Sequence, residues 1–512
     1  MSWFHPEPLL LPDMLALNAQ QRASQPAVTV GDTTLDWGSF GRECARFASA
    51  VHNAGLTPGD RVGVVMNNAL DTLIAVFGSI YGGYVVVPIN VSVADDALAT
   101  MLSDSGARAV ICNGEHTARV HALRARLAIT LWVATEPHEG WELFSQWLSA
   151  ANMDHAPARV SPSDYCNIIY SSGTTGLPKG IVHDHRCRSA WAYDMAVALR
   201  YHPGARTLCS LGLYSNISWV AMLSTVLAGG SLIVMPAFDV AACLALIAEQ
   251  RITHTTMVPV QLQRILAHPA FDAAAVASLQ SLMCCGSPLA PATKQQVVDA
   301  FGGAFLELYG LTEGLVSVLQ PEDMATKIRS VGRPSPGQHI VILDNDDNAC
   351  PPGVSGEIVG RGPLQMAGYH QRDDANQDAT WVDAEGVRWL RTGDIGMFDE
   401  AGYLYLVDRK KDMIISGGQN IYPADIEAVL IEQPEIDEVA VIGVASERWG
   451  ETPIAVVVGD VADEQALMST VNSRLGKQQR IAAVRCVDAL PRNPNGKVLK
   501  RELRTRFSDV TL

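Results

Sequence analysis

The chain has 512 residues, of which 48% are hydrophobic and 18% are charged, and its formal net charge is −16. A chain of this length and composition folds into two or more domains and is not disordered. The negative charge argues against nucleic acid and anionic membranes as partners, because both repel an acidic surface.

The ten cysteines are scattered along the chain, and no C-x-x-C pair occurs. We therefore predict reduced, mostly buried thiols in a cytoplasmic protein, without a zinc site. The N-terminus lacks a basic segment followed by an apolar run, so no signal peptide is expected. The most hydrophobic stretch, 73–89, is interrupted by glycines and a proline, which indicates buried elements and no integral membrane association.

Helix and strand patterns alternate through the first part of the chain. Helices are expected over 36–56, 70–81 and 94–105. Strands are expected over 61–65, 84–88, 109–112, 166–170, 231–235, 255–258 and 304–309. Short aliphatic strands separated by helices predict a largely parallel sheet that is covered on both faces.

The pattern changes after residue 335. Strands with Gly and Pro turns, typical of an antiparallel region, are expected over 341–343, 356–360 and 403–407. The charged run 408–412 lies between two apolar strands and is predicted to be a linker. The remaining residues are enough for a small domain, with elements expected over 424–433, 438–443, 453–458 and 464–475. The predicted division is 1–407, a hinge at 408–412, and 413–512.

One loop carries chemistry that a linker does not need. Tyr170-Ser171-Ser172-Gly173-Thr174-Thr175-Gly176-Leu177-Pro178-Lys179-Gly180 follows a predicted buried strand. Its backbone N–H groups, hydroxyls and single ammonium suit a polyphosphate, and strand ends are where α/β proteins place ligands. It is not a P-loop, because Gly180 stands where that motif has Ser or Thr. A flexible surface loop is the alternative, but the upstream strand argues against it.

Four further segments occur in order after this loop. They are Leu308-Tyr309-Gly310-Leu311-Thr312-Glu313, Arg391-Thr392-Gly393-Asp394, the stretch from 408 to 423 with Asp408-Arg409-Lys410-Lys411-Asp412 and Ser416-Gly417-Gly418, and Pro491-Arg492-Asn493-Pro494-Asn495-Gly496-Lys497. Each alone has an ordinary reading, such as a helix cap, a turn or an exposed lysine. Together they resemble the adenylate-forming superfamily over roughly residues 20–505, and most closely its acyl- and aryl-CoA synthetase branch.

The resemblance implies an α/β fold with two parts. A large N-terminal domain would hold two mixed, helix-covered β-sheets plus a distorted β-barrel subdomain, and a small mobile α+β lid would form the C-terminal domain. The implied reaction uses ATP, Mg²⁺ and CoA. A carboxylate first attacks the α-phosphate to give an acyl-adenylate and pyrophosphate, and a thiol then attacks the acyl carbon and expels AMP.

The resemblance also implies roles for individual residues. Lys179 would cradle the β- and γ-phosphates with Thr174 and Thr175, Glu313 would hold Mg²⁺, and Thr312 would bond the α-phosphate. Lys497 would bridge the carboxylate and the α-phosphate, so the implied catalytic residues are Lys497, Thr312, Glu313 and Lys179. The implied ATP-binding residues are Ser171, Ser172, Gly173, Thr174, Thr175, Gly176, Lys179, Gly286, Ser287, Pro288, Tyr309, Gly310, Thr312, Asp394 and Arg409, with Tyr309 on the adenine and Asp394 on the ribose.

The lid would rotate about Lys411, withdraw Lys497 and present Ser416, Gly417 and Gly418 to the CoA pantetheine. The acyl pocket is expected at Tyr214, Ser215, Asn216, Cys285, Gly286, Gly310 and Leu311. Many relatives carry an aromatic-His pair at 214–215, but here Ser215 follows Tyr214. Small residues dominate this expected wall, and no Asp or Lys stands out as a partner for a substrate amino group. We therefore expect a fatty, aryl or bulky alicyclic acid rather than an amino acid.

The leading interpretation is a carboxylic acid:CoA ligase of fatty acid or secondary metabolism. The alternatives are a freestanding adenylation enzyme that loads the phosphopantetheine of a carrier protein, an inactive nucleotide-binding relative, and a luciferase-like oxygenase. The expected partners are a small-molecule carboxylic acid and CoA or a carrier protein, with no nucleic acid. The identity of the acid stays open, as does a homodimer.

Overall fold

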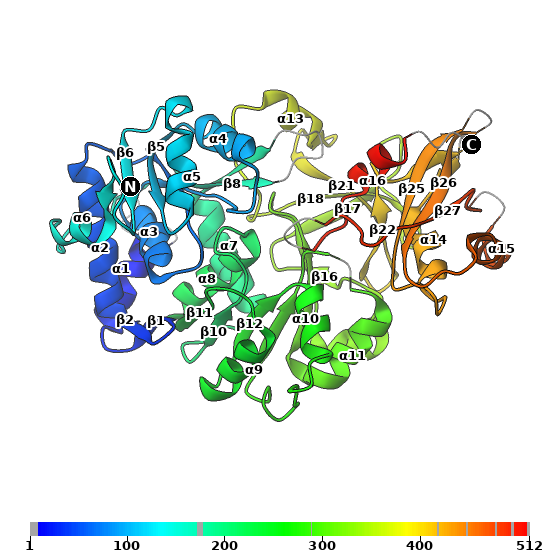
Figure 1. The fold of residues 1–512 in the computed structure, drawn as a ribbon, viewed down its shortest axis with the longest axis horizontal. Helices are drawn as coiled ribbons and strands as arrows, with labels where there is room; N and C mark the ends of the chain where they lie inside the picture. The colour runs from blue at the N-terminus through cyan, green and yellow to red at the C-terminus, as the bar shows by residue number, and fades with distance from the viewer. Residues whose placement is uncertain are drawn as a thin grey trace. The chain divides into compact units, whose positions relative to one another are not determined.

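The computed structural model describes residues 9–171, 178–287, 289–416, 419–446, 449–476, 479–492 and 496–508 (Figure 1). The chain forms two compact units. Unit 1 is built from the residues up to 328 together with 334–339 and 361–380. Unit 2 is built from 329–333, 340–360 and the residues from 381 onward.

The first sheet of unit 1 runs in the order β15-β14-β13-β12-β10-β11-β1-β2. Its central pairs are parallel, while β14–β15 and β1–β2 are antiparallel. The strands are β1 (Pro26–Val30), β2 (Thr33–Asp36), β10 (Arg206–Cys209), β11 (Ser231–Val234), β12 (His254–Met257), β13 (Ser281–Cys284), β14 (Phe305–Gly310) and β15 (Val316–Leu319). The short β16 (Arg333–Pro334) lies at the boundary between the units in the sequence.

The second sheet of unit 1 runs in the order β19-β9-β8-β4-β3-β5-β6-β7. It is parallel except where β9 pairs with β8 and with β19. The strands are β3 (Arg61–Val65), β4 (Val85–Pro88), β5 (Ala107–Cys112), β6 (Leu131–Ala134), β7 (Glu142–Leu143), β8 (Tyr165–Ser171), β9 (Lys179–Asp184) and β19 (Gly368–Tyr369). The largely parallel, helix-covered character predicted from the aliphatic strands is confirmed.

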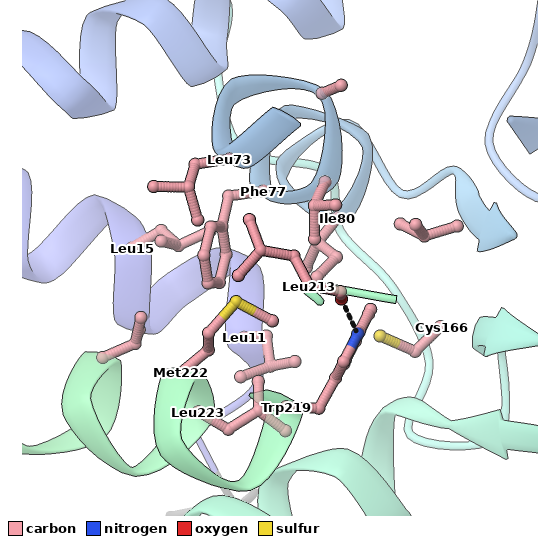
Figure 2. Packing of buried hydrophobic residues seen from close by; sticks show 14 of the residues in the cluster. Leu11, Leu15, Leu73, Phe77, Ile80, Cys166, Leu213, Trp219, Met222 and Leu223 are labelled. Carbon is pink, nitrogen blue, oxygen red and sulfur yellow. Dashed lines mark hydrogen bonds between the residues drawn. The ribbon is translucent and has the colours of Figure 1, made fainter. Parts of the chain in front are cut away.

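One large core joins the helices of unit 1 to both sheets. It takes residues from α1 (Leu11–Gln21), α2 (Trp37–Asn53), α3 (Leu70–Tyr81), α7 (His185–Ala198) and α8 (Asn216–Ala228). Figure 2 shows Phe77 of α3 and Met222 of α8 facing one another within it, with Trp219 donating from its indole N–H to the Leu213 carbonyl at 3.1 Å. This bond ties the start of α8 to the loop that follows β10.

The other helices of unit 1 are shorter or more peripheral. They are α4 (Asp95–Asp104), α5 (His116–Ala122), α6 (Phe144–Ser149), α9 (Val240–Glu249), α10 (Pro259–Leu266), α11 (Pro291–Phe301), α12 (Met324–Lys327) and α13 (Asp373–Asp378). Across the described part of the chain, none of the helices is both long and apolar enough to cross a membrane.

Unit 2 contains two smaller sheets. The first runs β17-β18-β21-β20, with β22 also paired to β21, and its strands are β17 (His339–Leu343), β18 (Gly356–Arg361), β20 (Thr380–Val382), β21 (Arg388–Phe398) and β22 (Leu404–Arg409). The second runs β24-β23-β26-β25, with β27 paired to β26, and its strands are β23 (Ile414–Ser416), β24 (Gln419–Ile421), β25 (Glu438–Ser446), β26 (Gly450–Val458) and β27 (Val484–Cys486). The helices α14 (Pro423–Leu430), α15 (Glu464–Arg474) and α16 (Lys500–Arg506) supply residues to its two cores.

The predicted linker is partly strand. β22 continues through Asp408 and Arg409, two residues into the charged run. Asp408 accepts from the backbone N–H of Ala424, and Arg409 pairs in register with Asp394. These bonds stabilise the strand, so only 410–412 form a turn between the two sheets of unit 2. The hinge at 408–412 and the domain limits around it stay predictions.

Candidate active site

The loop predicted to bind a polyphosphate begins and ends on neighbouring strands. Ser171 closes β8, Lys179 opens β9, and the two residues face each other in the antiparallel pair. Ser172, Gly173, Thr174, Thr175 and Gly176 lie outside the described residues. The expected strand-end position of the loop is therefore confirmed at both of its ends, while the phosphate contacts of its centre stay predictions.

The segments predicted to hold the adenine leave adjacent strands. β13 and β14 pair in parallel with Cys284 opposite Glu307, so the residues after each strand emerge side by side. Gly286 and Ser287 follow β13, and Tyr309 and Gly310 end β14. Pro288 lies outside the described residues. This edge is formed by the carboxyl ends of parallel strands, where open α/β sheets bind ligands.

Thr312 and Glu313 lie in a tight turn between β14 and β15. The backbone N–H of Leu311 donates to the Leu315 carbonyl at 3.1 Å, which closes the turn. Gly314 has φ +110°, and a Cβ there would lie 1.9 Å from the Leu364 carbonyl oxygen, so only glycine fits. The Glu313 carbonyl accepts from the N–H of Met366. The turn is thus braced by the chain that leads to β19.

Tyr369 connects Glu313 to Lys179. Its phenol donates to Glu313 Oε1 at 2.9 Å, and the Lys179 ammonium lies 5.0 Å from the centroid of its ring. Burial, the Glu313 charge and this hydrogen bond all raise the pKa of Tyr369, so it stays a protonated donor. Two hydrogen bonds with the Asn376 side chain fix its backbone. Tyr369 was not predicted from the sequence. The dipeptide Gly368-Tyr369 matches no motif, and both partners of Tyr369 lie far from it along the chain.

A fully buried histidine reaches the same turn from β9. His183 Nε2 lies 2.8 Å from the Thr312 carbonyl oxygen, and its Nδ1 contacts Asn167 and Arg188. Arg188 was also missed, although the sequence contains a signal for it. It shares a helical face with the apolar Trp191, and a cation on a buried face requires partners.

Three of the residues predicted to line the acyl pocket lie at the start of α8. Ser215 caps this helix, Asn216 is its first residue, and Tyr214 precedes both. Gly286 has φ +100°, and a Cβ there would lie 3.3 Å from Ile217 Cδ1. Gly286 therefore lies close to the beginning of α8, while the acyl pocket itself stays a prediction. Burial raises the pKa of the Tyr214 phenol, which stays neutral.

The remaining charged candidate residues, Asp394, Arg409 and Lys497, belong to unit 2. Arg409 Nε lies 3.0 Å from Asp394 Oδ1, and Asp394 is buried. Lys497 lies close enough to both that their charges act on its pKa, together with those of Lys411 and Asp412. Burial, and then the Arg409 and Lys411 cations, lower the pKa of Lys497 to about 7, against the opposing pull of the two carboxylates.

The predicted pantetheine-facing segment is seen only in part. Ser416 is buried at the end of β23 and pairs with Gly450 of β26 and Gln419 of β24. Gly417 and Gly418 lie outside the described residues. The role of these three residues therefore stays a prediction.

Comparison with known proteins identifies the family. The sequence model of the AMP-binding enzyme family matches residues 15–370, and that of the AMP-binding enzyme C-terminal domain matches residues 425–497. A feruloyl-CoA synthase from Amycolatopsis sp is 35% identical over 489 residues, which cover 94% of this chain and 96% of that protein. The fatty acid–[acyl-carrier-protein] ligase ScoC from Streptomyces coeruleorubidus is 32% identical over 516 residues, 98% of this chain and 97% of that protein.

Comparison with solved structures gives a similar result. The crystal structure of ATP-bound MatB from Rhodopseudomonas palustris superimposes with a TM-score of 0.89 and 26% sequence identity over 97% of this chain and 99% of that one. The fold class expected from the motifs, a large two-sheet N-terminal domain and a small C-terminal domain, is thereby confirmed. With both family models matched, this chain belongs to the AMP-binding enzymes, the adenylate-forming superfamily whose members include acyl- and aryl-CoA ligases.

Proposed function

We propose that this protein is an ATP-dependent carboxylic acid:CoA ligase that forms an acyl-adenylate and then an acyl-CoA thioester. The observation that carries the proposal is the cluster of Lys497 with Asp394 and Arg409 in unit 2. A buried carboxylate with two acceptor oxygens suits the vicinal hydroxyls of a ribose. A lysine beside it would then lie near the α-phosphate that the same nucleotide carries.

The first half-reaction joins two anions, so positive charge and positioning are the main requirements. A carboxylate oxygen attacks the α-phosphorus, and the bond to the pyrophosphate oxygen breaks. Lys497 would contact the oxygens of the bond being formed, and Lys179 would contact the departing pyrophosphate. Thr312 would donate its hydroxyl to the α-phosphate, and the contact of His183 with its carbonyl would hold its backbone in place.

The chemistry of Glu313 fits a magnesium ion that arrives with ATP. Mg²⁺ is commonly bound through one or two carboxylates together with substrate phosphates and water. The described residues contain no group of three or more His, Cys, Asp or Glu side chains that would hold a metal without the nucleotide. Glu313 would hold the ion while Tyr369 orients its carboxylate, and the ion supplies charge neutralisation at the phosphates.

Replacing Tyr369 with phenylalanine should weaken the response to magnesium. The variant keeps the ring beside Lys179 but removes the hydrogen bond to Glu313, and a hydrogen bond to a charged group contributes about 1.5–3 kcal/mol. We expect the Mg²⁺ concentration for half-maximal pyrophosphate release to rise about tenfold. Tyr165→Phe is the control, because that side chain is 41% exposed on the same sheet. An unchanged Mg²⁺ dependence in Tyr369→Phe would contradict the orienting role.

In the second half-reaction a thiolate attacks the acyl carbon and AMP leaves. The lid would rotate about Lys411 between the two half-reactions. This rotation would withdraw Lys497 and bring residues 416–418 to the pantetheine. CoA is the proposed acceptor because the curated relatives include CoA ligases. The similarity to a ligase acting on an acyl-carrier protein keeps a carrier phosphopantetheine as the second candidate.

The proposed acid is fatty, aryl or bulky alicyclic. The relatives' names cover a feruloyl and a fatty acyl group, and Tyr214 offers a neutral aromatic wall. The cysteines are free thiols, eight of them buried, which supports the proposed location in the reducing cytoplasm.

The test is AMP release from ATP with a panel of carboxylic acids, measured with CoA, with a phosphopantetheinylated carrier protein, and with neither. The proposal expects acid-dependent pyrophosphate release, and AMP release with an acyl-CoA detected by mass spectrometry when CoA is present. AMP release that requires the carrier protein and not CoA would favour the second candidate. Absence of acid-dependent pyrophosphate release from every acid would contradict both.

A further inference from the structure

Arg188 is a buried cation on α7 of unit 1. Its side chain is 0% exposed, and its guanidinium lies 4.7 Å from the centroid of the Trp219 ring. Burial lowers its pKa to about 10, so it is still charged at neutral pH. Within the described ranges its hydrogen-bond partners are two amides and an imidazole, none of them negatively charged. A buried charge without a counter-charge is costly, and proteins retain it where it serves a purpose.

The guanidinium fixes the orientation of each partner, because arginine only donates hydrogen bonds. Its Nε donates to Asn167 Oδ1 at 2.6 Å, and its Nη1 donates to Asn216 Oδ1 at 2.8 Å. Its Nη2 donates to His183 Nδ1 at 3.1 Å, so this nitrogen carries no proton. Burial, and then the Arg188 charge, hold the pKa of His183 well below its usual range, so the ring is neutral. The ring proton is therefore on Nε2, which donates to the Thr312 carbonyl.

The same logic determines what Asn216 presents to the acyl pocket. With its oxygen bonded to Arg188, its NH₂ group points to the other side of the amide. Asn216 is partly exposed at the start of α8, between Tyr214 and Ile217, the residue that a Cβ at Gly286 would approach at 3.3 Å. An NH₂ group on this side would offer N–H donors to the pocket, backed by a cation whose hydrogen-bond partners among the described residues are all neutral. A hydrocarbon placed there would leave the donors unpaired, whereas an acceptor oxygen would satisfy them.

We propose that Arg188 is a positioning residue that turns the Asn216 amide N–H toward the acyl pocket, and that the enzyme selects acids carrying a second acceptor oxygen. That oxygen, a carbonyl or a carboxylate, is additional to the carboxylate that is activated. The inference rests on the proposed ligase activity and narrows its substrate class. Arg188 itself touches no substrate, and it acts on selectivity through Asn216.

Asn216→Asp is the sharpest test. The new carboxylate occupies the place of the amide and forms an ion pair with Arg188, so folding is preserved. Its second oxygen replaces the NH₂ group, which turns a donor into an acceptor facing the pocket. An acid with a second oxygen then loses its hydrogen-bond donor, so its advantage over the matched hydrocarbon acid should disappear. Asn53→Asp, an exposed position at the end of α2, controls for the added charge.

The measurement is kcat/KM for pyrophosphate release with matched acids on three skeletons. They are octanoate against its ω−1 keto derivative and octanedioate, phenylpropanoate against acetylphenylpropanoate, and cyclohexylpropanoate against oxocyclohexylpropanoate. We expect the wild type to prefer the oxygenated member of at least one pair by about tenfold or more, the effect of one well-made hydrogen bond. The keto and dicarboxylate arms identify which oxygen it takes.

In Asn216→Asp that preference should disappear, measured as the ratio of kcat/KM within each matched pair and not as either rate alone. Arg188→Met should also lose the preference, because the amide is then free to turn, and it should lose it without an equal loss of hydrocarbon turnover. If Arg188→Met does not fold, Asn216→Asp alone decides. Equal preference in the wild type, or equal losses for both members of a pair in Asn216→Asp, would overturn this inference and leave the ligase proposal intact. Absence of pyrophosphate release with every acid contradicts the ligase proposal, and the inference falls with it.

Discussion

Lys497→Ala should lower carboxylate-dependent pyrophosphate exchange by a factor of about 10² to 10³ or more, the loss typical when a charge-stabilising group is removed from a transition state. Thiolation of an acyl-adenylate supplied from outside should be spared, because the proposed lid rotation withdraws Lys497 before CoA reacts. The two half-reactions are measured separately, by isotope exchange and by acyl-CoA formation from synthetic acyl-adenylate. Equal loss in both would contradict the alternation of the lid.

The pKa of Lys497 adds a pH dependence to this prediction. With a pKa of about 7, the ammonium is fully formed only below neutrality and is lost as pH rises through 7. Adenylation requires the charged form, so kcat/KM for pyrophosphate exchange in the wild type should be flat at acidic pH and should fall above about pH 7. Lys497→Arg keeps a cation that does not titrate in this range. Its exchange rate, although lower, should show no such fall.

A matched control separates Lys497 from general effects of charge on the lid. Arg501 is an exposed cation on α16 of the same unit. Arg501→Ala should keep both half-reactions within about twofold of the wild type, as is usual for surface substitutions. If Arg501→Ala also lowered pyrophosphate exchange more than tenfold, the effect of Lys497→Ala would reflect the net charge of the lid rather than a specific contact.

The sequence predicted those parts of the protein in which a local pattern and a local structure coincide. The helix expected over 70–81 is α3, because its apolar spacing, its glycine stop and the following strand all agree. The strand-end positions of Ser171 and Tyr309 were also predictable, since each motif follows an aliphatic run that forms a strand, whereas β9, which Lys179 opens, was not predicted. Family resemblance then supplied the order of the motifs and the two-part architecture.

The rest could not be predicted because it depends on pairing between distant segments. Tyr369 reaches Glu313 only because β19 pairs with β9 beside Lys179, and no local pattern encodes that register. Arg188 was hidden for a related reason. Its partners Asn167 and Asn216 come from a strand and a helix in different parts of the chain. The charged run 408–412 was predicted to be a linker, but its first two residues, Asp408 and Arg409, belong to β22. Asp408 bonds to Ala424, and Arg409 pairs with Asp394.

A second large effect is expected on stability, at the strand that carries Tyr309. Lys294 of α11 and Glu307 of β14 form an ion pair at only 3% and 7% side-chain exposure. Burial raises the pKa of Glu307 more than the Lys294 charge lowers it. The carboxylate is therefore stabilised by Lys294 but still disfavoured by its surroundings. Breaking one side of such a pair leaves an unpaired buried charge, which costs about 3–5 kcal/mol.

Lys294→Met should accordingly lower the free energy of unfolding of unit 1 by about 3–5 kcal/mol. Urea unfolding monitored by tryptophan fluorescence measures this change. The double variant Lys294→Met with Glu307→Leu should recover most of this loss, because two apolar side chains of similar volume avoid the cost of burying charge. Arg126→Met is the control, since its pair with Asp96 is exposed and such pairs contribute about 0–1 kcal/mol. A double variant as unstable as the single one would show that the pair fixes β14 by geometry rather than by charge compensation. The ATP binding proposed at Tyr309 should then weaken in both variants.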